Sequence, residues 1–236
     1  MLRLALVPGL AKPSLSRLIS RLGLICLMRR MFAEHGITHV LDVGANTGQY
    51  GRMLRRHVGY RGSITSFEPV GSTYERLRSQ IRKDPRWTVH RLALSDEAGE
   101  RQINVMNASE LSSLYTPSTS ETKAFSGVNT VIRTEVVQTV RLDEFLDGGD
   151  DYFLKLDTQG HDLTVLEGAN TMLDRICACQ IEVSCLRIYE GIPTMSDALR
   201  YMDRIGFDLC GLFPIAVVRP NRVVEFDAVF VNRARC

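Results

Sequence analysis

The stretch LDVGANTGQY, Leu41 to Tyr50, joins an apolar run to a helical pattern. Gly44 and Gly48 permit a tight turn in which the backbone can touch a ligand, and the helix that follows offers free N–H groups. The turn lacks the G-x-G-x-x-G spacing that lets two phosphates approach a helix N-terminus. Asp42, at the strand end, would repel phosphate, whereas its charge suits a cation. The stretch therefore predicts a strand–turn–helix unit that binds a cationic ligand.

Outward from this stretch, short apolar runs alternate with helical patterns, which is typical of a parallel sheet with crossover helices. We expect parallel strands at residues 38–44, 62–69, 87–94, 151–157 and 178–184. We expect helices at residues 49–56, 72–82, 161–173 and 196–205, the second opened by a Ser72–Glu75 capping box. Segments 207–213 and 223–232 have no helix between them, so they should pair antiparallel. The predicted α/β fold is a seven-stranded, mostly parallel sheet ending in an antiparallel hairpin, which resembles the Rossmann-like class I methyltransferases.

Between about residues 100 and 145 the pattern loosens. Segments 101–107 and 135–142 alternate as strands, while residues 116–127 are rich in Ser and Thr and show no periodicity. We interpret this region as a β-rich insertion whose long loop covers the substrate.

Polar residues at consecutive strand ends predict a nucleoside site, because ligands of open α/β sheets bind outside the carboxyl ends of the strands. Glu68, 24 residues after Gly44, can accept both hydroxyls of a ribose. Leu94 and Ser95 follow the next strand and could frame an adenine. The acidic turn favours the ammonium and sulfonium groups of S-adenosylmethionine over a dinucleotide. The candidate residues for binding this cofactor are Asp42, Gly44, Asn46, Gly48, Tyr50, Glu68, Leu94, Ser95 and Asp157.

Six motifs in order resemble the FkbM family of S-adenosylmethionine-dependent O-methyltransferases. They are LDVGANTGQY, FEP, LALSDEAG, VRLDEFL, KLDTQGHDLTVLEGA and IEVSCLRIYEG, and they lie between about residues 40 and 207. The resemblance implies a Rossmann-like fold and methylation of hydroxyl groups on sugars or polyketide-derived lipids. One departure is the pair His161 and Asp162, which stands where the family pattern QGxE carries its acid.

The last two parallel strands carry the catalytic candidates, Lys155, Asp157, His161 and Glu182. An alcohol is almost fully protonated at neutral pH, so a general base is expected, and Asp157, His161 and Glu182 all remain open for that role. Lys155 is assigned to the acceptor or to orienting a carboxylate. A purely structural ion pair between Lys155 and Glu182 is the alternative.

Three further residues, Ser113, Gln159 and Tyr189, are candidate contacts to the acceptor. Asp157, His161 and Glu182 could also converge on a divalent metal, which we do not favour. The six cysteines form no CxxC pair, and no zinc ligand set is visible. We therefore predict no metal site.

The formal charge of +2 is too small to indicate nucleic acid as a partner, yet it is unevenly spread. Residues 1–61 hold ten Lys or Arg and two acids. Residues 1–36 are interpreted as a basic helical segment before a methyltransferase domain at 37–236. From Ser14 a helix is expected to bury one stripe, made of Leu15, Leu18, Ile19, Leu22 and Cys26.

The basic helix is expected to pack on the domain or on a second subunit of a homodimer; peripheral contact with an anionic membrane is the alternative. No apolar run is long enough to cross a membrane, so a cytoplasmic enzyme is predicted, with the inner membrane face as its alternative location. Its acceptor is predicted to be a saccharide or glycolipid. A cofactor-binding module without turnover, and a methyltransferase acting on a polyketide or lipid hydroxyl, remain open.

Overall fold

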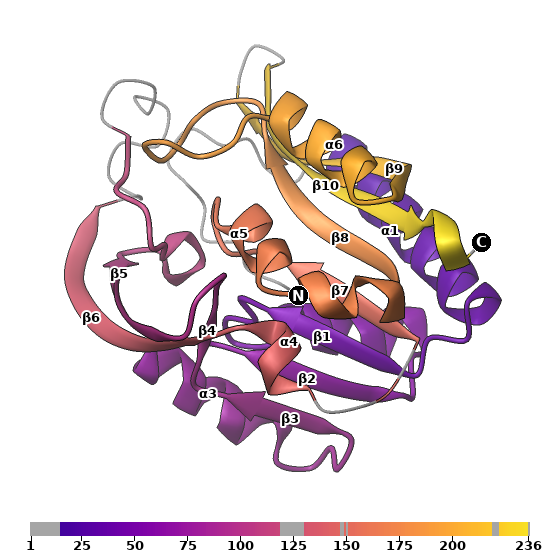
Figure 1. Cartoon of the computed structure of the whole chain (residues 1–236), viewed down its shortest axis with the longest axis horizontal. Helices are drawn as coiled ribbons and strands as arrows, with labels where there is room; N and C mark the ends of the chain where they lie inside the picture. Colours follow the sequence, from indigo (N-terminus) through magenta and orange to yellow (C-terminus); the bar gives the residue numbers. More distant parts are fainter. Residues whose placement is uncertain (1–14, 119–129, 147–148, 150, 219–221, 236) are drawn as a thin grey trace.

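A seven-stranded sheet forms the centre of the protein (Figure 1). The computed structural model describes residues 15–118, 130–146, 149, 151–218 and 222–235. Only the strand β10 runs against its two neighbours, and every other pair within the sheet is parallel. The strand order is β3 (Trp87–His90), β2 (Ser63–Phe67), β1 (His39–Val43), β7 (Tyr152–Leu156), β8 (Ile176–Ser184), β10 (Arg222–Asn232) and β9 (Phe207–Val218). The predicted fold class is confirmed.

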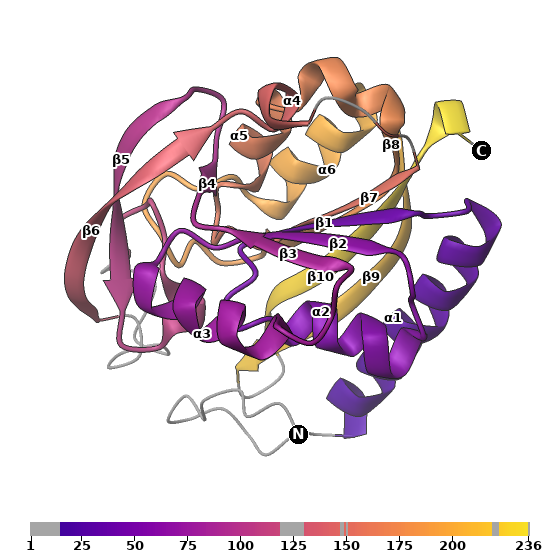
Figure 2. The same ribbon diagram turned by 90° about the horizontal axis from the view of Figure 1, so that it is seen from below.

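Helices cover both faces of this sheet (Figure 2). One face carries α1 (Leu15–Glu34), α2 (Gln49–Met53) with the π-helical turn Leu54–Val58, and α3 (Gly71–Ile81). The other carries α4 (Leu142–Phe145), α5 (Asp162–Glu167) with the 3₁₀ turn Asn170–Arg175, and α6 (Met195–Arg204). Each layer has its own apolar core against the sheet. Because side chains alternate along a strand, a polar residue in the sheet points into one layer only.

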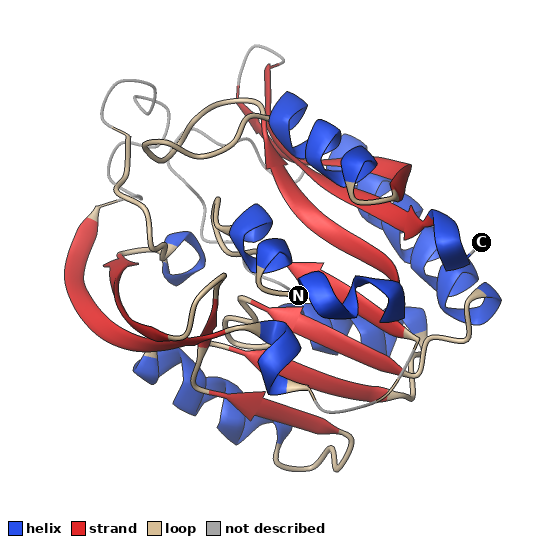
Figure 3. Cartoon of the chain, in the orientation of Figure 1, coloured by secondary structure: helices blue, strands red, loops and turns tan. Residues whose placement is uncertain are grey.

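The strand expected at 87–94 is two strands in different sheets. After β3 the chain leaves the main sheet, and β4 (Ala93–Leu94) pairs in parallel with β6 (Val131–Val140). β6 also pairs antiparallel with β5 (Gly99–Met106), which completes the second, three-stranded sheet of the insertion (Figure 3). The β5–β6 hairpin supplies the partner strand of β4, which the sequence around β4 could not reveal. Most of the expected covering loop, 119–129, lies outside the described residues.

Two helix boundaries differ from expectation. α3 begins at Gly71 with Val70 as its N-cap and without a side-chain cap, so the predicted Ser72–Glu75 capping box is wrong. The helix expected over 161–173 ends as an α-helix at Glu167 and is followed by the 3₁₀ turn Asn170–Arg175. Between them, a Cβ on Gly168 would lie only 2.0 Å from the Ser95 carbonyl oxygen. This close approach holds the end of α5 against the loop after β4.

The buried face of α1 was also predicted wrongly. Leu18, Ile19 and Leu22 are 54%, 60% and 53% exposed, and Cys26 is exposed as well. The helix instead buries its C-terminal half, through Leu24, Ile25, Met28, Met31 and Phe32. Apolar residues lie on more than one side of this helix, so periodicity alone could not select the side that meets the sheet. No helix in the described part of the chain is both long and apolar enough to span a membrane.

Candidate active site

The turn after β1 is held between the ends of two neighbouring strands. The N–H groups of Gly44 and Ala45 both donate to the Phe67 carbonyl oxygen, at 3.0 and 3.1 Å. Gly44 has a φ of +72°, and a Cβ there would lie 1.9 Å from the Asp157 carbonyl oxygen. Only glycine satisfies both the backbone angle and this contact. The turn therefore brings the ends of β1, β2 and β7 together.

Glu68 follows β2 and closes the same turn. Its Oε2 accepts the Asn46 N–H and its Oε1 accepts the Val70 N–H, each at 2.9 Å. The side chain is buried, and burial raises its pKa to about 7 despite these two hydrogen bonds. Asn46 adopts a φ of +47°, and its Nδ2 donates to Ser109 Oγ at 3.2 Å. Each carboxylate oxygen of Glu68 keeps an acceptor site beyond its backbone bond.

A buried lysine joins two carboxylates beside this turn. Lys155 Nζ lies 3.2 Å from Asp42 Oδ1 and 3.3 Å from Asp157 Oδ2. Burial opposes the ammonium charge, but Asp157 and Asp42 outweigh it and raise the pKa of Lys155. Tyr50 lies with its ring centroid 5.5 Å from the ammonium group. The alternative considered for Lys155, an ion pair with Glu182, is not what the structure has: the register of β1 and β7 places Asp42 directly opposite Lys155.

Gln159 joins the carboxylates of two strands. Its Nε2 donates to Asp157 Oδ1 at 3.1 Å and to Glu182 Oε2 at 2.7 Å. Its Oε1 lies 3.0 Å from the Tyr189 hydroxyl, and its carbonyl oxygen accepts the Ser113 hydroxyl at 2.9 Å. Ser113 and Tyr189 thus both bond Gln159, which joins the three predicted acceptor contacts. Gln159 takes a left-handed φ of +56°. Such a conformation is costly for a residue with a Cβ, so the surrounding contacts must fix it.

Two acids that the sequence analysis missed complete the network. Asp227 lies opposite Glu182 in the β8–β10 register, and Glu225 lies opposite Ser184. Burial and neighbouring carboxylates raise the pKa of Glu225 to about 7 and that of Asp227 to about 6. Burial and then Glu225 raise the pKa of Glu182 well above its usual value. Because β10 is antiparallel, its beginning meets the carboxyl ends of β7 and β8.

His161 lies in a different set of contacts from the other catalytic candidates. Its Nε2 is 3.0 Å from Ser95 Oγ, and its ring centroid is 5.8 Å from that of Tyr115. Burial lowers its pKa to about 4, with Arg101 adding to the shift. The buried Nδ1 has no hydrogen-bond partner among the described residues. The structure therefore does not place His161 with Asp157 and Glu182 as an alternative base.

Asp162 and Leu94, the sequence neighbours of His161 and Ser95, have structural contacts. Asp162 accepts hydrogen bonds from the Thr158 N–H at 2.9 Å and from the Glu182 N–H at 3.2 Å. It therefore anchors the loop after β7 to β8. Leu94, predicted to frame an adenine, is buried in the core of the α5 and α6 layer. Within the described ranges, no three His, Cys, Asp or Glu side chains are placed to hold a metal ion, so Asp157, His161 and Glu182 do not converge on one.

Comparisons with known proteins bear on the family and the fold. The model of the methyltransferase FkbM domain matches residues 42–209. No curated protein matches the chain. Among solved structures, methyltransferase FkbM from Methylobacillus flagellatus KT aligns over 83% of this chain with a TM-score of 0.52 and 15% identity. The chain spans only 43% of the length of that protein. Magnesium protoporphyrin IX methyltransferase from Synechocystis PCC 6803, with bound SAM, aligns over 91% of this chain and 80% of its own length, at 8% identity and a TM-score of 0.44.

Proposed function

The chain belongs to the FkbM methyltransferase family, and from this premise we propose that it transfers a methyl group from S-adenosylmethionine to a hydroxyl group of a sugar. The sugar is proposed to belong to a precursor of a bacterial glycolipid or polysaccharide. The observation that carries the proposal is the Gln159 bridge between Asp157 and Glu182, next to the turn at Gly44.

The residues beside the turn fit S-adenosylmethionine. Glu68 presents two carboxylate oxygens, each already fixed by one backbone N–H, which suits the paired hydroxyls of a ribose. Asp157 and Asp227 offer carboxylates to an ammonium and a sulfonium group. When bound, the cofactor supplies an electrophilic methyl group. Gly44, Asn46 and Glu68 would hold its nucleoside, and Asp157 its amino-acid part.

Glu182 is proposed to take the proton from the acceptor hydroxyl. A base works best when its pKa lies near the operating pH, and burial, followed by Glu225 and the other nearby acids, raises the pKa of Glu182 above its usual value. Asp157 pairs with Lys155 at 3.3 Å and is assigned to the cofactor. Gln159 fixes the spacing of the two carboxylates. General-base assistance of this kind contributes about 10² to 10⁴ in rate.

A polyol is the acceptor that the lining supports best. Carboxylates accept hydrogen bonds from hydroxyl groups, and the Gln159 amide and the Tyr189 hydroxyl add polar groups of both kinds. A polyol can exchange hydrogen bonds with these groups, whereas a long aliphatic chain offers them neither donors nor acceptors.

The proposal is tested by incubating the protein with S-adenosylmethionine and a panel of free, nucleotide-linked and lipid-linked sugars. Mass spectrometry should detect products heavier by one methylene group. Glu182→Gln should lower kcat by about 10² or more while keeping cofactor affinity, whereas the exposed Glu190→Gln should change neither. Cofactor binding without product across the panel would indicate a binding module. Methylation confined to polyketide or lipid hydroxyls would show that these compounds, and not sugars, are the substrates.

A further inference from the structure

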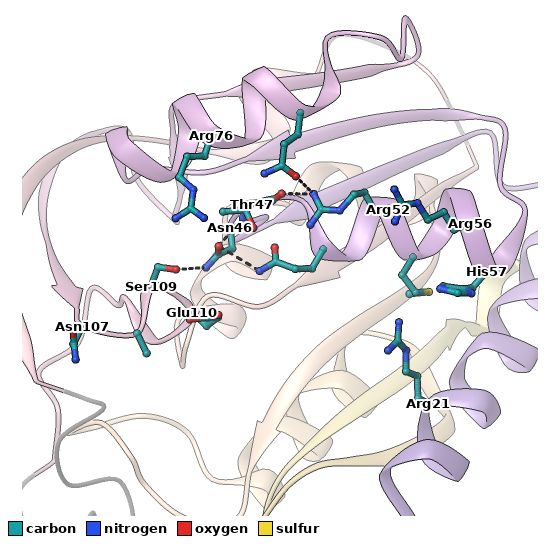
Figure 4. Close-up of a pocket in the computed structure, with 14 residues that line it drawn as sticks. Arg21, Asn46, Thr47, Arg52, Arg56, His57, Arg76, Asn107, Ser109 and Glu110 are labelled. Atoms are coloured by element: carbon teal, nitrogen blue, oxygen red, sulfur yellow. Dashed lines mark hydrogen bonds between the residues drawn. The ribbon is translucent and has the colours of Figure 1, made fainter. Parts of the chain in front are cut away.

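A second feature lies on the outer side of the turn, away from the acidic network. A pocket of about 540 Å³ opens between α1, α2, α3 and the segment Asn107–Glu110 (Figure 4). Its charged lining is mostly basic, with Arg21 from α1, Arg52 and Arg56 from α2 and the π-helical turn, and Arg76 from α3. Glu110 is the acid among the lining residues. Four guanidinium groups therefore share one pocket with a single carboxylate.

These arginines differ from others in the chain. Arg55 pairs with Asp84 at 2.8 Å, Arg141 with Asp143 at 2.7 Å, and Arg133 with Glu135 at 2.6 Å. Within the described ranges, no ion pair involves any of the four arginines of the pocket.

Of the four, Arg52 is the one with hydrogen-bond partners in the described structure, the Thr47 carbonyl oxygen and the Gln80 side chain, and both are neutral. Burial and then the charge of Arg56 lower the pKa of Arg52. Like charges held together without a counter-ion repel one another, so an anion bound there would relieve this repulsion.

The residue types indicate which anion fits. A guanidinium group binds phosphate oxygens through two parallel hydrogen bonds, and several arginines around one cavity suit a group with several such oxygens. The pocket also contains Asn46, Thr47 and Ser109, whose amide and hydroxyl groups suit the polar molecule attached to the phosphate. Asn46 and Thr47 belong to the turn that begins at Gly44. A molecule in this pocket therefore lies against the proposed cofactor turn.

We propose that this pocket binds a diphosphate group of the methyl acceptor, which would make the acceptor a sugar carried on a nucleoside diphosphate or on a lipid diphosphate. The identity of the acceptor rests on the proposed function, whereas the diphosphate site itself does not. The pocket would fix one end of the acceptor and leave the sugar hydroxyls to the residues around Gln159.

The test measures binding without turnover. Isothermal titration with inorganic pyrophosphate should show saturable binding to the full chain. The double variant Arg56→Gln/Arg76→Gln should weaken it at least about tenfold, because it removes two of the four guanidinium groups that line the pocket. Arg78→Gln is the matched control, since Arg78 also lies on α3 but pairs with Glu75. S-adenosylhomocysteine should bind all three proteins equally.

Four results would overturn the proposal. Pyrophosphate could fail to saturate, or could bind the double variant as tightly as the original chain. The double variant could lose affinity for S-adenosylhomocysteine, which would assign the pocket to the carboxylate of the cofactor. Single-stranded RNA could bind with an affinity that increases with its length and depends on the same arginines, which would assign the surface to nucleic acid.

Two further binding experiments distinguish a nucleotide carrier of the sugar from a lipid carrier. Displacement of pyrophosphate by uridine diphosphate, without binding to phosphatidylcholine vesicles containing a polyprenyl diphosphate, supports a nucleotide-linked sugar. Binding to those vesicles that the double variant loses supports a lipid-linked sugar. Because no methyl transfer is measured, a negative acceptor panel would contradict the proposed function and leave this result intact.

Discussion

Lys155 shows how one residue can hold the centre of the sheet together. Its ammonium group is the partner of both Asp42 and Asp157, and Asp42 is fully buried. Removing one member of a buried ion pair leaves an uncompensated charge, which typically costs about 3 to 5 kcal/mol. We predict that Lys155→Met lowers the free energy of unfolding by about that amount, measured by urea denaturation. Lys155→Met/Asp42→Asn should recover part of the loss, and purely additive effects would contradict the pairing.

The raised pKa of Glu182 predicts a pH dependence of the rate. Its carboxylate must be deprotonated to act as a base, so kcat should increase as pH rises through that pKa. Glu225→Gln removes the ionisable neighbour that is the second cause of the raised pKa of Glu182, and it should shift the acidic limb of the kcat profile toward lower pH. Glu190→Gln is the control for a remote charge. A limb that stays in place or moves upward would exclude Glu182 as the titrating group.

At the scale of elements, local patterns predicted the main strands because a buried parallel strand needs a continuous apolar run. They failed where a partner distant in sequence decides the outcome. β4 joins the insertion because β6 offers it a free edge, and α5 ends where Gly168 touches Ser95. The residues around Gln159 were predictable from strand ends alone. Glu225 and Asp227 were missed, although two acids in an apolar strand are the same signal that identified Lys155.

The turn between β1 and α2 predicts an asymmetric response to substitution of glycine. Gly44→Ala combines a positive φ with a Cβ placed 1.9 Å from the Asp157 carbonyl oxygen. Gly59→Ala has a φ of +83° but no atom within 4 Å of its Cβ. Gly59→Ala should cost about 1 kcal/mol of unfolding free energy, as expected for backbone strain alone. Gly44→Ala should cost several times more and abolish cofactor binding, measured by denaturation and titration. Equal costs would show that the turn can move away from β7.

At the scale of the whole molecule, the uneven charge of the chain resolves into two sites of opposite sign. The acids gather at the carboxyl ends of β7 and β8 and at the start of β10, where the proposed cofactor is cationic. Part of the basic excess of residues 1–61 lines the pocket on the outer side of the turn. Other basic residues stabilise loops, as Arg55 does through Asp84 and the carbonyl oxygens of Tyr60 and Gly62. Composition revealed the asymmetry, but only the tertiary structure separates these roles.

The acidic site should set the pH dependence of stability. Burial raises the pKa values of Glu68 and Glu225 to about 7 and those of Asp162 and Asp227 to about 6. The folded protein therefore holds more protons than the unfolded chain between about pH 4 and 7, and the stability from these groups is lost as pH rises through their folded-state pKa values. His161 acts in the opposite direction, because its folded-state pKa lies below its unfolded one.

Asp42 and Glu182 also have raised pKa values, and His39 and His90 have lowered ones like His161. Because the six carboxyl groups outnumber the three imidazoles, the thermal midpoint of the ligand-free protein should fall between about pH 5 and pH 8. The double variant Glu225→Gln/Asp227→Asn should fall less steeply, because its amides do not ionise. At the upper pH, S-adenosylmethionine should raise the midpoint more than S-adenosylhomocysteine at equal saturation, since only the former carries a sulfonium charge for the ionised acids. A midpoint that rises with pH, or equal stabilisation by the two ligands, would show that these carboxyl groups ionise without strain and do not face the cofactor.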